Sequence, residues 1–105
     1  GGMKKRIGIA RAIAIQPDYL FYDEPTTGLD PVMTDSINRL ILKFQETGRT
    51  TSLVVTHEMR TVYDVADRVI MLHDGTIIFD GNPLDIEKSD NKIVQQFVTG
   101  DSTLV

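Results

Sequence analysis

The sequence predicts an α/β protein in which a short parallel sheet is flanked by helices and followed by an antiparallel hairpin. Two apolar runs, residues 19–22 and 51–56, are short and rich in aromatic or β-branched side chains, which favours strands buried on both faces. An amphipathic segment, residues 32–47, separates them, and this strand–helix–strand order is typical of a right-handed parallel crossover. The Asp74-Gly75 pair between two later apolar runs is a strong hairpin signal.

The composition indicates a globular domain and argues against several other classes of protein. The chain has 105 residues, of which 41% are hydrophobic and 25% charged, as in ordinary globular domains. A net charge of −4 argues against broad binding of nucleic acid. The sequence has no cysteine, which excludes disulfides and thiolate metal sites. No apolar run approaches the roughly 20 residues of a membrane-spanning helix, so we expect any work at a membrane to involve a partner subunit.

The first helix is expected over residues 3–15, introduced by Gly1 and Gly2. Glycines before a helix let a phosphate approach its exposed N–H groups and the positive end of its dipole. On these two glycines alone, a flexible chain end is the alternative interpretation. One face of the helix is expected to carry an apolar stripe made of Met3, Ile7, Ala10 and Ala14. The basic residues 4–6 are interpreted as a solvated face and are assigned no site.

Two adjacent acidic residues, Asp23 and Glu24, directly follow the first apolar run. Open parallel sheets place their ligand crevices at the carboxyl ends of strands, so this position suits a divalent metal and a base that activates water. Because successive strand side chains point to opposite faces, the two carboxylates are expected to have different roles. For an isolated acid pair, a solvated turn is the alternative. Pro25 and Gly28 indicate that the chain turns here.

The second helix is expected to begin at Asp30-Pro31, an N-cap residue followed by proline at the first helical position. Its apolar side is expected to carry Ile37, Leu40, Ile41 and Phe44. His57 follows the second strand, and a parallel crossover would place it beside Asp23 and Glu24 at one edge of the sheet. For a lone histidine, a surface or structural role is the alternative.

After His57, the pattern predicts helices and strands but no further candidate site residues. We expect a helix over residues 59–66, hairpin strands over 68–73 and 76–80, a helical turn over 84–87 and a final helix over 92–98. The hairpin is expected to add an antiparallel edge to the first sheet. Residues 100–105 are expected to fray or to reach a partner.

In order along the chain, these features resemble four motifs of the ATP-binding cassette (ABC) ATPases. Residues 1–3, Gly-Gly-Met, resemble the tail of the signature motif, and residues 20–24 resemble the Walker B motif. Residues 28–30 resemble the D-loop, and His57 resembles the switch histidine. The resemblance covers nearly the whole chain. It implies a partial P-loop NTPase-like fold, with residues 1–105 forming the C-terminal part of one ATP-binding domain.

The resemblance also implies roles for the candidate residues. Two subunits would sandwich two ATP molecules, with Asp23 assisting magnesium, through water, and Glu24 activating the water that attacks the γ-phosphate. His57 would steady that phosphate, in a reaction that depends mostly on positioning and charge stabilisation. The Gly1-Gly2 pair would contact nucleotide bound by the opposite subunit, and Asp30 would couple the two sites across the dimer.

The phosphate loop is not found in these 105 residues, since no Gly-x-x-x-x-Gly-Lys-Ser/Thr pattern occurs. The adenine-stacking aromatic residue, the glutamine loop and the leading Leu-Ser of the signature are not visible either. We therefore expect the chain to need the missing half before it can use ATP and Mg²⁺. A non-catalytic fragment that only pairs with other subunits is an alternative.

Within the ABC family, residues 3–6, 22–31 and 96–100 look like the Mla-type phospholipid transporters of Gram-negative bacteria, also described as organic-solvent resistance transporters. This implies a phospholipid cargo, a homodimer of ATP-binding subunits, membrane permease partners and a peripheral location on the cytoplasmic face of the inner membrane. An amino-acid or other small-molecule importer is the alternative. A DNA-maintenance ATPase head is disfavoured by the negative charge and the lack of a sustained heptad, so no nucleic-acid partner is expected.

Overall fold

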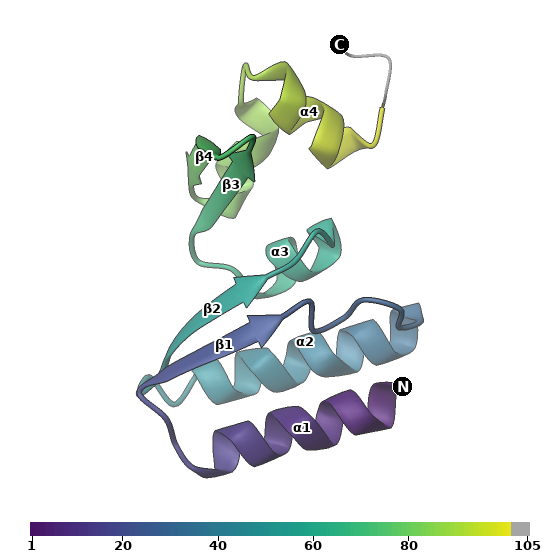
Figure 1. Cartoon of the computed structure of the whole chain (residues 1–105), viewed down its shortest axis with the longest axis vertical. Coiled ribbons are helices and arrows are strands. Elements are labelled where there is room, and N and C mark those ends of the chain that lie inside the picture. Colours follow the sequence, from purple (N-terminus) through teal and green to yellow (C-terminus); the bar gives the residue numbers. More distant parts are fainter. Residues whose placement is uncertain (102–105) are drawn as a thin grey trace. The chain divides into compact units, whose positions relative to one another are not determined.

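A computed structural model of the chain describes residues 1–101. It confirms the α/β class expected from the sequence (Figure 1). The chain divides into two compact units, Gly1–Val65 and Ala66–Val105. The expectation that the chain end frays or reaches a partner falls largely on residues 102–105, which lie outside the described residues. No helix within residues 1–101 is long and apolar enough to cross a membrane.

The first unit is a two-stranded parallel sheet with three helices (Figure 1). Its elements are α1 (Gly2–Ala14), β1 (Tyr19–Asp23), α2 (Pro31–Gln45), β2 (Thr51–Val55) and α3 (Met59–Val65). The strands pair in register, with Tyr19 opposite Thr51 and Asp23 opposite Val55. Because α2 joins two parallel strands, the expected parallel strand–helix–strand connection is confirmed. The carboxyl ends of both strands therefore lie at the same edge of the sheet.

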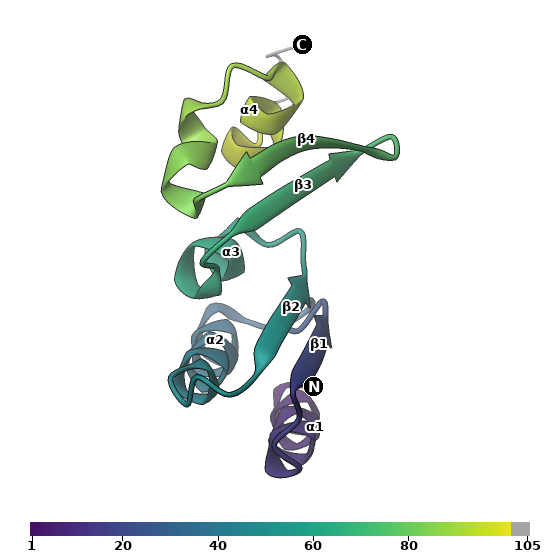
Figure 2. The ribbon, with the colours of Figure 1, turned by 90° about the vertical axis from the view of Figure 1, so that its left-hand side faces the viewer.

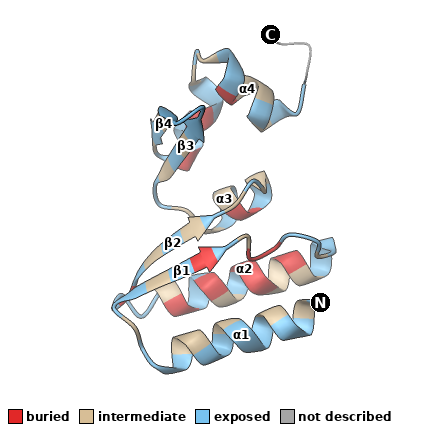
Figure 3. Ribbon diagram, viewed as in Figure 1, coloured by how far each residue is buried: buried red, intermediate tan, exposed pale blue. Residues whose placement is uncertain are grey.

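The core of this unit lies between one face of the sheet and the helices (Figure 3). Tyr22 of β1 packs with Ile37 and Ile41 of α2, and all three are at most 5% exposed. Ile37 and Ile41 are four residues apart, so they lie on the same side of the helix, one turn from each other. The apolar side predicted for α2 is thus the side that packs.

The other face of the parallel sheet is exposed, so the expectation that residues 19–22 are buried on both faces is wrong. Tyr19 is 80% exposed, and Phe21 and Leu53 are each 58% exposed. Side chains alternate along a strand, and the helices of the first unit pack on the face that carries Tyr22. The run is apolar on both faces, but the first unit covers only one of them.

The packed face of α1 also differs from the predicted one. The predicted stripe is exposed in the structure: Met3, Ile7, Ala10 and Ala14. The partly buried positions are instead Gly2, Lys5, Ile9, Ala12 and Ile13. Ile9 packs against the core cluster of Tyr22 and α2. Apolar residues occur nearly all round this helix, so their spacing alone does not select the face that packs.

The second unit contains an antiparallel hairpin and two short helices. Its elements are β3 (Val69–His73), β4 (Thr76–Gly81), a 3₁₀ helix (Pro83–Lys88) and α4 (Lys92–Thr99). Figure 2 shows the two strands side by side. Asp74 and Gly75 have φ values of 49° and 73°, and positive φ at both positions is what a tight two-residue turn requires. Ile86 and Val94 are fully buried in this unit.

The hairpin forms a sheet of its own, whereas the sequence predicted an extra edge on the first sheet. Among the described strands, β1 pairs with β2, and β3 pairs with β4. The two-residue turn at Asp74 joins β3 directly to β4, so their pairing is local and needs no strand of the first unit. Arg68 adds a two-pronged contact across the hairpin, with Nε and Nη2 lying 2.8 and 2.7 Å from the two Asp80 carboxylate oxygens.

Candidate functional site

Most of the residues predicted to carry chemistry lie at one edge of the first unit. Asp23 is the last residue of β1, and His57 lies two residues after the end of β2. The same edge receives the N-terminal ends of α1 and α2, which Gly1 and Asp30 cap (Figure 1). The parallel crossover produces this arrangement, because it returns each strand to the same edge.

Glu24 and His57 are in direct contact. Glu24 Oε1 accepts a hydrogen bond from His57 Nδ1 at 2.9 Å, and Oε2 accepts one from the Thr27 hydroxyl at 2.9 Å. A carboxylate can only accept, so the hydrogen of this contact lies on Nδ1. The second ring nitrogen, Nε2, lies 3.9 Å from Glu58 Oε1. The Glu24 and His57 side chains are 33% and 60% exposed, so both are open to solvent.

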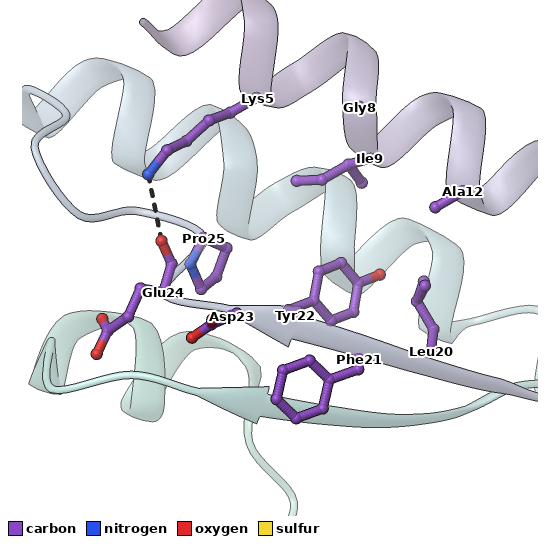
Figure 4. A pocket seen from close by; sticks show the side chains of 10 residues that line it. All are labelled: Lys5, Gly8, Ile9, Ala12, Leu20, Phe21, Tyr22, Asp23, Glu24 and Pro25. Atoms are coloured by element: carbon purple, nitrogen blue, oxygen red, sulfur yellow. Dashed lines mark hydrogen bonds between the residues drawn. The ribbon is translucent and has the colours of Figure 1, made fainter.

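Glu24 does not continue the alternation of strand β1, contrary to the reasoning that gave it a face opposite Asp23. The strand ends at Asp23, and Glu24 has a φ of 48°, in the left-handed region. Figure 4 shows both carboxylates on the same side of the ribbon. The backbone N–H of Glu24 still donates to the Val55 carbonyl at 2.7 Å, which anchors the residue to β2. This strained conformation aims the carboxylate at His57.

The contact changes the acidity of both groups. The hydrogen bond from His57, followed by that from Thr27, lowers the pKa of Glu24. The hydrogen bond to Glu24 and the negative charge of its carboxylate raise the pKa of His57. Glu24 is therefore ionised at neutral pH, and His57 holds its proton to a higher pH than an isolated histidine.

Asp23 directly precedes Glu24 in the sequence, but it does not belong to a cluster of metal-binding side chains among the described residues. Within residues 1–101, no group of three or more His, Cys, Asp or Glu side chains could hold a metal ion. Magnesium, however, is commonly held by one or two carboxylates together with waters and substrate phosphates. The exposed carboxylate of Asp23 at a strand end fits that mode of binding, and it does not fit an all-protein metal cage.

Gly1 and Gly2 differ in what surrounds them. Gly1 is the N-cap of α1 and makes no side-chain cap, and a Cβ there would meet nothing within 4 Å. A Cβ at Gly2 would collide with the side chain of Met33 on α2. A side chain at Gly2 would therefore need the flexible end of Met33 to move, whereas one at Gly1 would need no such change. No hydrogen bond joins Gly1 or Gly2 to Glu24 or His57.

Asp30 is the N-cap of α2, as its sequence context predicts. Its Oδ1 accepts a hydrogen bond from the Met33 N–H at 2.8 Å, and Pro31 occupies the first helical position. A capping carboxylate also complements the positive end of the helix dipole. Within this chain, Asp30 thus has a structural role that accounts for its position, and no hydrogen bond joins its side chain to Glu24 or His57.

Lys5 is a residue that the sequence reasoning missed. Its ammonium group donates to the carbonyl oxygens of Glu24 at 3.2 Å and of Thr27 at 2.8 Å. The lysine extends from α1 beside an open hollow of about 300 Å³ that is lined by α1 and by residues 20–25 (Figure 4). The basic run at residues 4–6 resembles any solvated face, so only the packing of α1 distinguishes Lys5 from its neighbours.

The same hollow is lined by Tyr22, whose hydroxyl is buried and makes no hydrogen bond within the described residues. Burial raises the pKa of Tyr22, and the nearby Ser52 hydroxyl opposes this effect. The other lining residues are largely small or apolar, among them Gly8, Ile9 and Ala12 of α1. The charged residues that line the hollow are therefore Lys5, Asp23 and Glu24.

Comparison with known proteins agrees with the resemblance to ABC ATPases, although no family model matches the chain. The arginine transport ATP-binding protein ArtM of Bacillus subtilis is 47% identical over 83 residues, which are 79% of this chain and 34% of ArtM. The methionine import ATP-binding protein MetN of Staphylococcus haemolyticus is 40% identical over 102 residues, 96% of this chain and 30% of MetN. The chloroplastic protein TRIGALACTOSYLDIACYLGLYCEROL 3 of Arabidopsis thaliana is 40% identical over 116 residues, 95% of this chain and 34% of that protein.

The chain spans about a third of the length of the curated relatives that it matches. It is thus similar to part of the ATP-binding proteins of ABC transporters. The relatives are named mostly for the transport or import of amino acids, and they do not single out the Mla type.

Proposed function

We propose that this chain is part of the ATP-binding subunit of an ABC transporter and that the edge carrying Glu24 and His57 takes part in ATP hydrolysis. The observation that carries the proposal is the 2.9 Å contact between these two side chains. They are 33 residues apart in sequence and come from the ends of two parallel strands. Similarity to transporter ATP-binding proteins supports the choice of ATP as the ligand.

The chemistry of the pair suits this reaction. Glu24 is ionised at neutral pH and can orient a water molecule and accept its proton. The lowered pKa makes it a weak base, so it would contribute mainly by positioning the water, as is usual in phosphoryl transfer. When His57 is protonated, Nδ1 donates to Glu24, and Nε2 can donate to a phosphate oxygen. The same histidine would thus steady both the base and the phosphate.

The remaining candidates have supporting roles in this proposal. Asp23 would hold Mg²⁺ through water, and the metal would supply charge neutralisation at the ATP phosphates. The Gly1-Gly2 pair, at the start of α1 where no side chain caps the helix, would contact nucleotide held by a second ATP-binding subunit. Asp30 would couple the two halves of that homodimer. A phosphate loop, which these 105 residues do not contain, would come from the rest of the subunit, so the chain alone would be inactive.

For the cargo, we favour an amino acid. Relatives are named for arginine transport, L-cystine import and methionine import. The phospholipid cargo expected from the Mla-type resemblance has weaker support, although one relative carries the name of a galactolipid. In either case, the partners would be membrane permease subunits, and the subunit would lie peripherally on the cytoplasmic face of a bacterial inner membrane.

Adding the missing half tests this proposal. The chain is mixed or fused with a phosphate-loop half taken from a related transporter ATP-binding protein, and Mg²⁺-dependent ATP hydrolysis is measured. Hydrolysis that the separate halves lack supports an ATPase subunit. If the fused protein folds and binds ATP but does not hydrolyse it, the chain is a non-catalytic partner and the proposal is wrong.

A further inference from the structure

Four polar side chains form a continuous hydrogen-bonded chain through the first unit. The Thr26 and Thr61 hydroxyl oxygens lie 2.9 Å apart, and the Thr61 hydroxyl lies 3.2 Å from Asn38 Oδ1. Asn38 Nδ2 donates to Asp64 Oδ2 at 3.1 Å. Thr26, Thr61 and Asn38 are 2%, 0% and 1% exposed, so three of the four members are cut off from water. We call this set the buried polar chain.

Chemistry fixes the direction of every hydrogen bond in the buried polar chain. The Asp64 carboxylate can only accept, so Asn38 must present its amide N–H₂ there and its carbonyl oxygen to Thr61. Thr61 has one hydroxyl hydrogen and donates it to Asn38. The hydrogen between the two threonines must therefore come from Thr26. One exposed charge at Asp64 thus sets the orientation of both buried hydroxyls.

The buried polar chain connects the three segments that carry Glu24, His57 and Asp30. Thr26 lies two residues after Glu24, in the turn between β1 and α2. Thr61 is in α3, four residues after His57. Asn38 is in α2, the helix that Asp30 caps. A displacement of the turn relative to α3 would break the Thr26–Thr61 hydrogen bond, and it would also change the distance between Glu24 and His57.

Burying hydroxyl and amide groups in a core carries a desolvation free energy that apolar side chains do not have. Each such group bears its full cost of desolvation when it loses its partner, whereas an apolar side chain of the same shape has no such penalty. Polar networks of this kind specify one arrangement of the elements around them, because only one arrangement satisfies every member. The hydrophobic cluster of Tyr22, Ile37 and Ile41 makes no comparable demand on geometry.

We propose that Thr26, Thr61 and Asn38 are positioning residues that hold the Glu24 turn against α3 and so fix the contact between Glu24 and His57. None of the three touches the reacting groups in the proposed reaction. The consequence for ATP hydrolysis rests on the function proposed above. The positioning itself is a property of this chain and can be measured without nucleotide.

The test uses Thr61→Val, which keeps the shape of the side chain and removes both of its hydrogen bonds. The pH titration of His57 is followed by NMR in the full 105-residue chain. The expected result is a downward shift of the His57 pKa toward the ordinary histidine value, because Glu24 no longer holds the ring. Thr61→Ser keeps the hydroxyl and is expected to restore the wild-type titration.

Thr50→Val is the matched control. Thr50 is also buried, at 6% exposed, and its hydroxyl also donates a hydrogen bond, here to the backbone carbonyl of Pro17 at the opposite end of the strands. This variant should lose stability yet leave the titration of His57 unchanged. Methyl resonances of Ile37 report whether each variant keeps the folded core, so that an unfolded sample is not mistaken for a positive result.

Thr26→Val gives a second, milder variant, since it removes only the hydrogen bond between the two threonines. It is expected to shift the His57 titration in the same direction as Thr61→Val. If both variants keep the folded core and His57 titrates as in the wild type, the positioning proposal is overturned. If the shift is found but the completed subunit does not hydrolyse ATP, the proposed function fails and the positioning stands.

Discussion

Lys5 of helix α1 donates from its ammonium group to the backbone carbonyl of Thr27 at 2.8 Å, and also to that of Glu24 at 3.2 Å. This contact joins the helix that begins with Gly1 and Gly2 to the turn that carries the proposed base. The turn is thus held by a lysine from α1 and by the Thr26–Thr61 hydrogen bond from α3. These two restraints come from separate elements, so each can be removed without the other.

Replacing Lys5 by methionine is expected to destabilise the first unit by about 1 kcal/mol, because two carbonyl groups lose a charged hydrogen-bond donor that is partly open to water. The quantity to measure is the free energy of unfolding in urea. Lys4→Met is the matched control, since this neighbouring lysine is exposed and should change stability by less than about 0.5 kcal/mol. Equal effects of the two substitutions would show that the Lys5 contact contributes nothing.

The Glu24–His57 pair predicts a pH dependence of stability. The raised pKa of His57 contributes stability that is fully present below the ordinary histidine pKa of about 6.5 and is lost as the pH rises through the folded value. The lowered pKa of Glu24 contributes stability that is present above the ordinary glutamate pKa of about 4.3 and is lost as the pH falls through the folded value. The pair therefore stabilises the fold most between about pH 4.3 and 6.5.

Unfolding curves of the wild type and of Glu24→Gln, recorded from acid to mildly alkaline pH, measure this effect. The difference between the two proteins should be largest inside that window and should shrink on both sides of it. His73→Gln provides a control, because His73 lies in the second unit, whereas Glu24 and His57 lie in the first. A difference between wild type and Glu24→Gln that does not vary with pH would contradict an ionic contact between Glu24 and His57.

Asp30→Ala should cost about 1 kcal/mol of stability through loss of the α2 N-cap, and Asp30→Asn should cost much less because asparagine caps equally well. Urea unfolding gives both values. In the completed subunit, the proposed coupling across the dimer depends on the negative charge of Asp30. Asp30→Ala and Asp30→Asn should then both slow ATP hydrolysis. Full activity of Asp30→Asn would confine Asp30 to its capping role.

Gly2→Ala and Gly8→Ala separate packing from ligand approach. Gly8 lies inside α1, where a Cβ would meet nothing within 4 Å, so alanine should stabilise the chain by about 0.5–1 kcal/mol. At Gly2 a Cβ would meet the flexible end of Met33, which can move, so the loss of stability should be small. If Gly2 lies against nucleotide as proposed, only Gly2→Ala should slow ATP hydrolysis in the completed dimer. Equal activity of the two variants would remove Gly2 from the site.

Local chemistry made much of the fold predictable. Asp30-Pro31 and Asp74-Gly75 have strong intrinsic preferences for a helix start and a tight turn, and the structure has both. The strand–helix–strand order also predicted which strand ends meet, and hence the proximity of Glu24 and His57. These features depend on residues close in sequence or on the parallel direction of two strands joined by one helix, which a pattern can reveal.

Other features depend on packing that no local pattern contains. The packed face of α1 was mispredicted because apolar residues surround that helix, and Lys5 could not be told from Lys4. The hydrogen bond between Thr26 and Thr61 joins residues 35 apart, and Thr26 looks like an ordinary turn residue in the sequence. The exposed face of β1 was mispredicted because an apolar run shows which side chains favour burial and does not show what covers them.

The most direct test of the proposed function is the rate of ATP hydrolysis by the completed subunit with Glu24→Gln. If Glu24 orients and activates the water, kcat should fall by about 10²-fold or more while ATP binding is largely kept, because a neutral amide replaces the carboxylate that orients the water and can accept its proton. Glu46→Gln, at the far end of α2, serves as the control and should hydrolyse ATP at the wild-type rate. A Glu24→Gln protein that hydrolyses ATP at a near-normal rate would contradict the role of the Glu24–His57 pair.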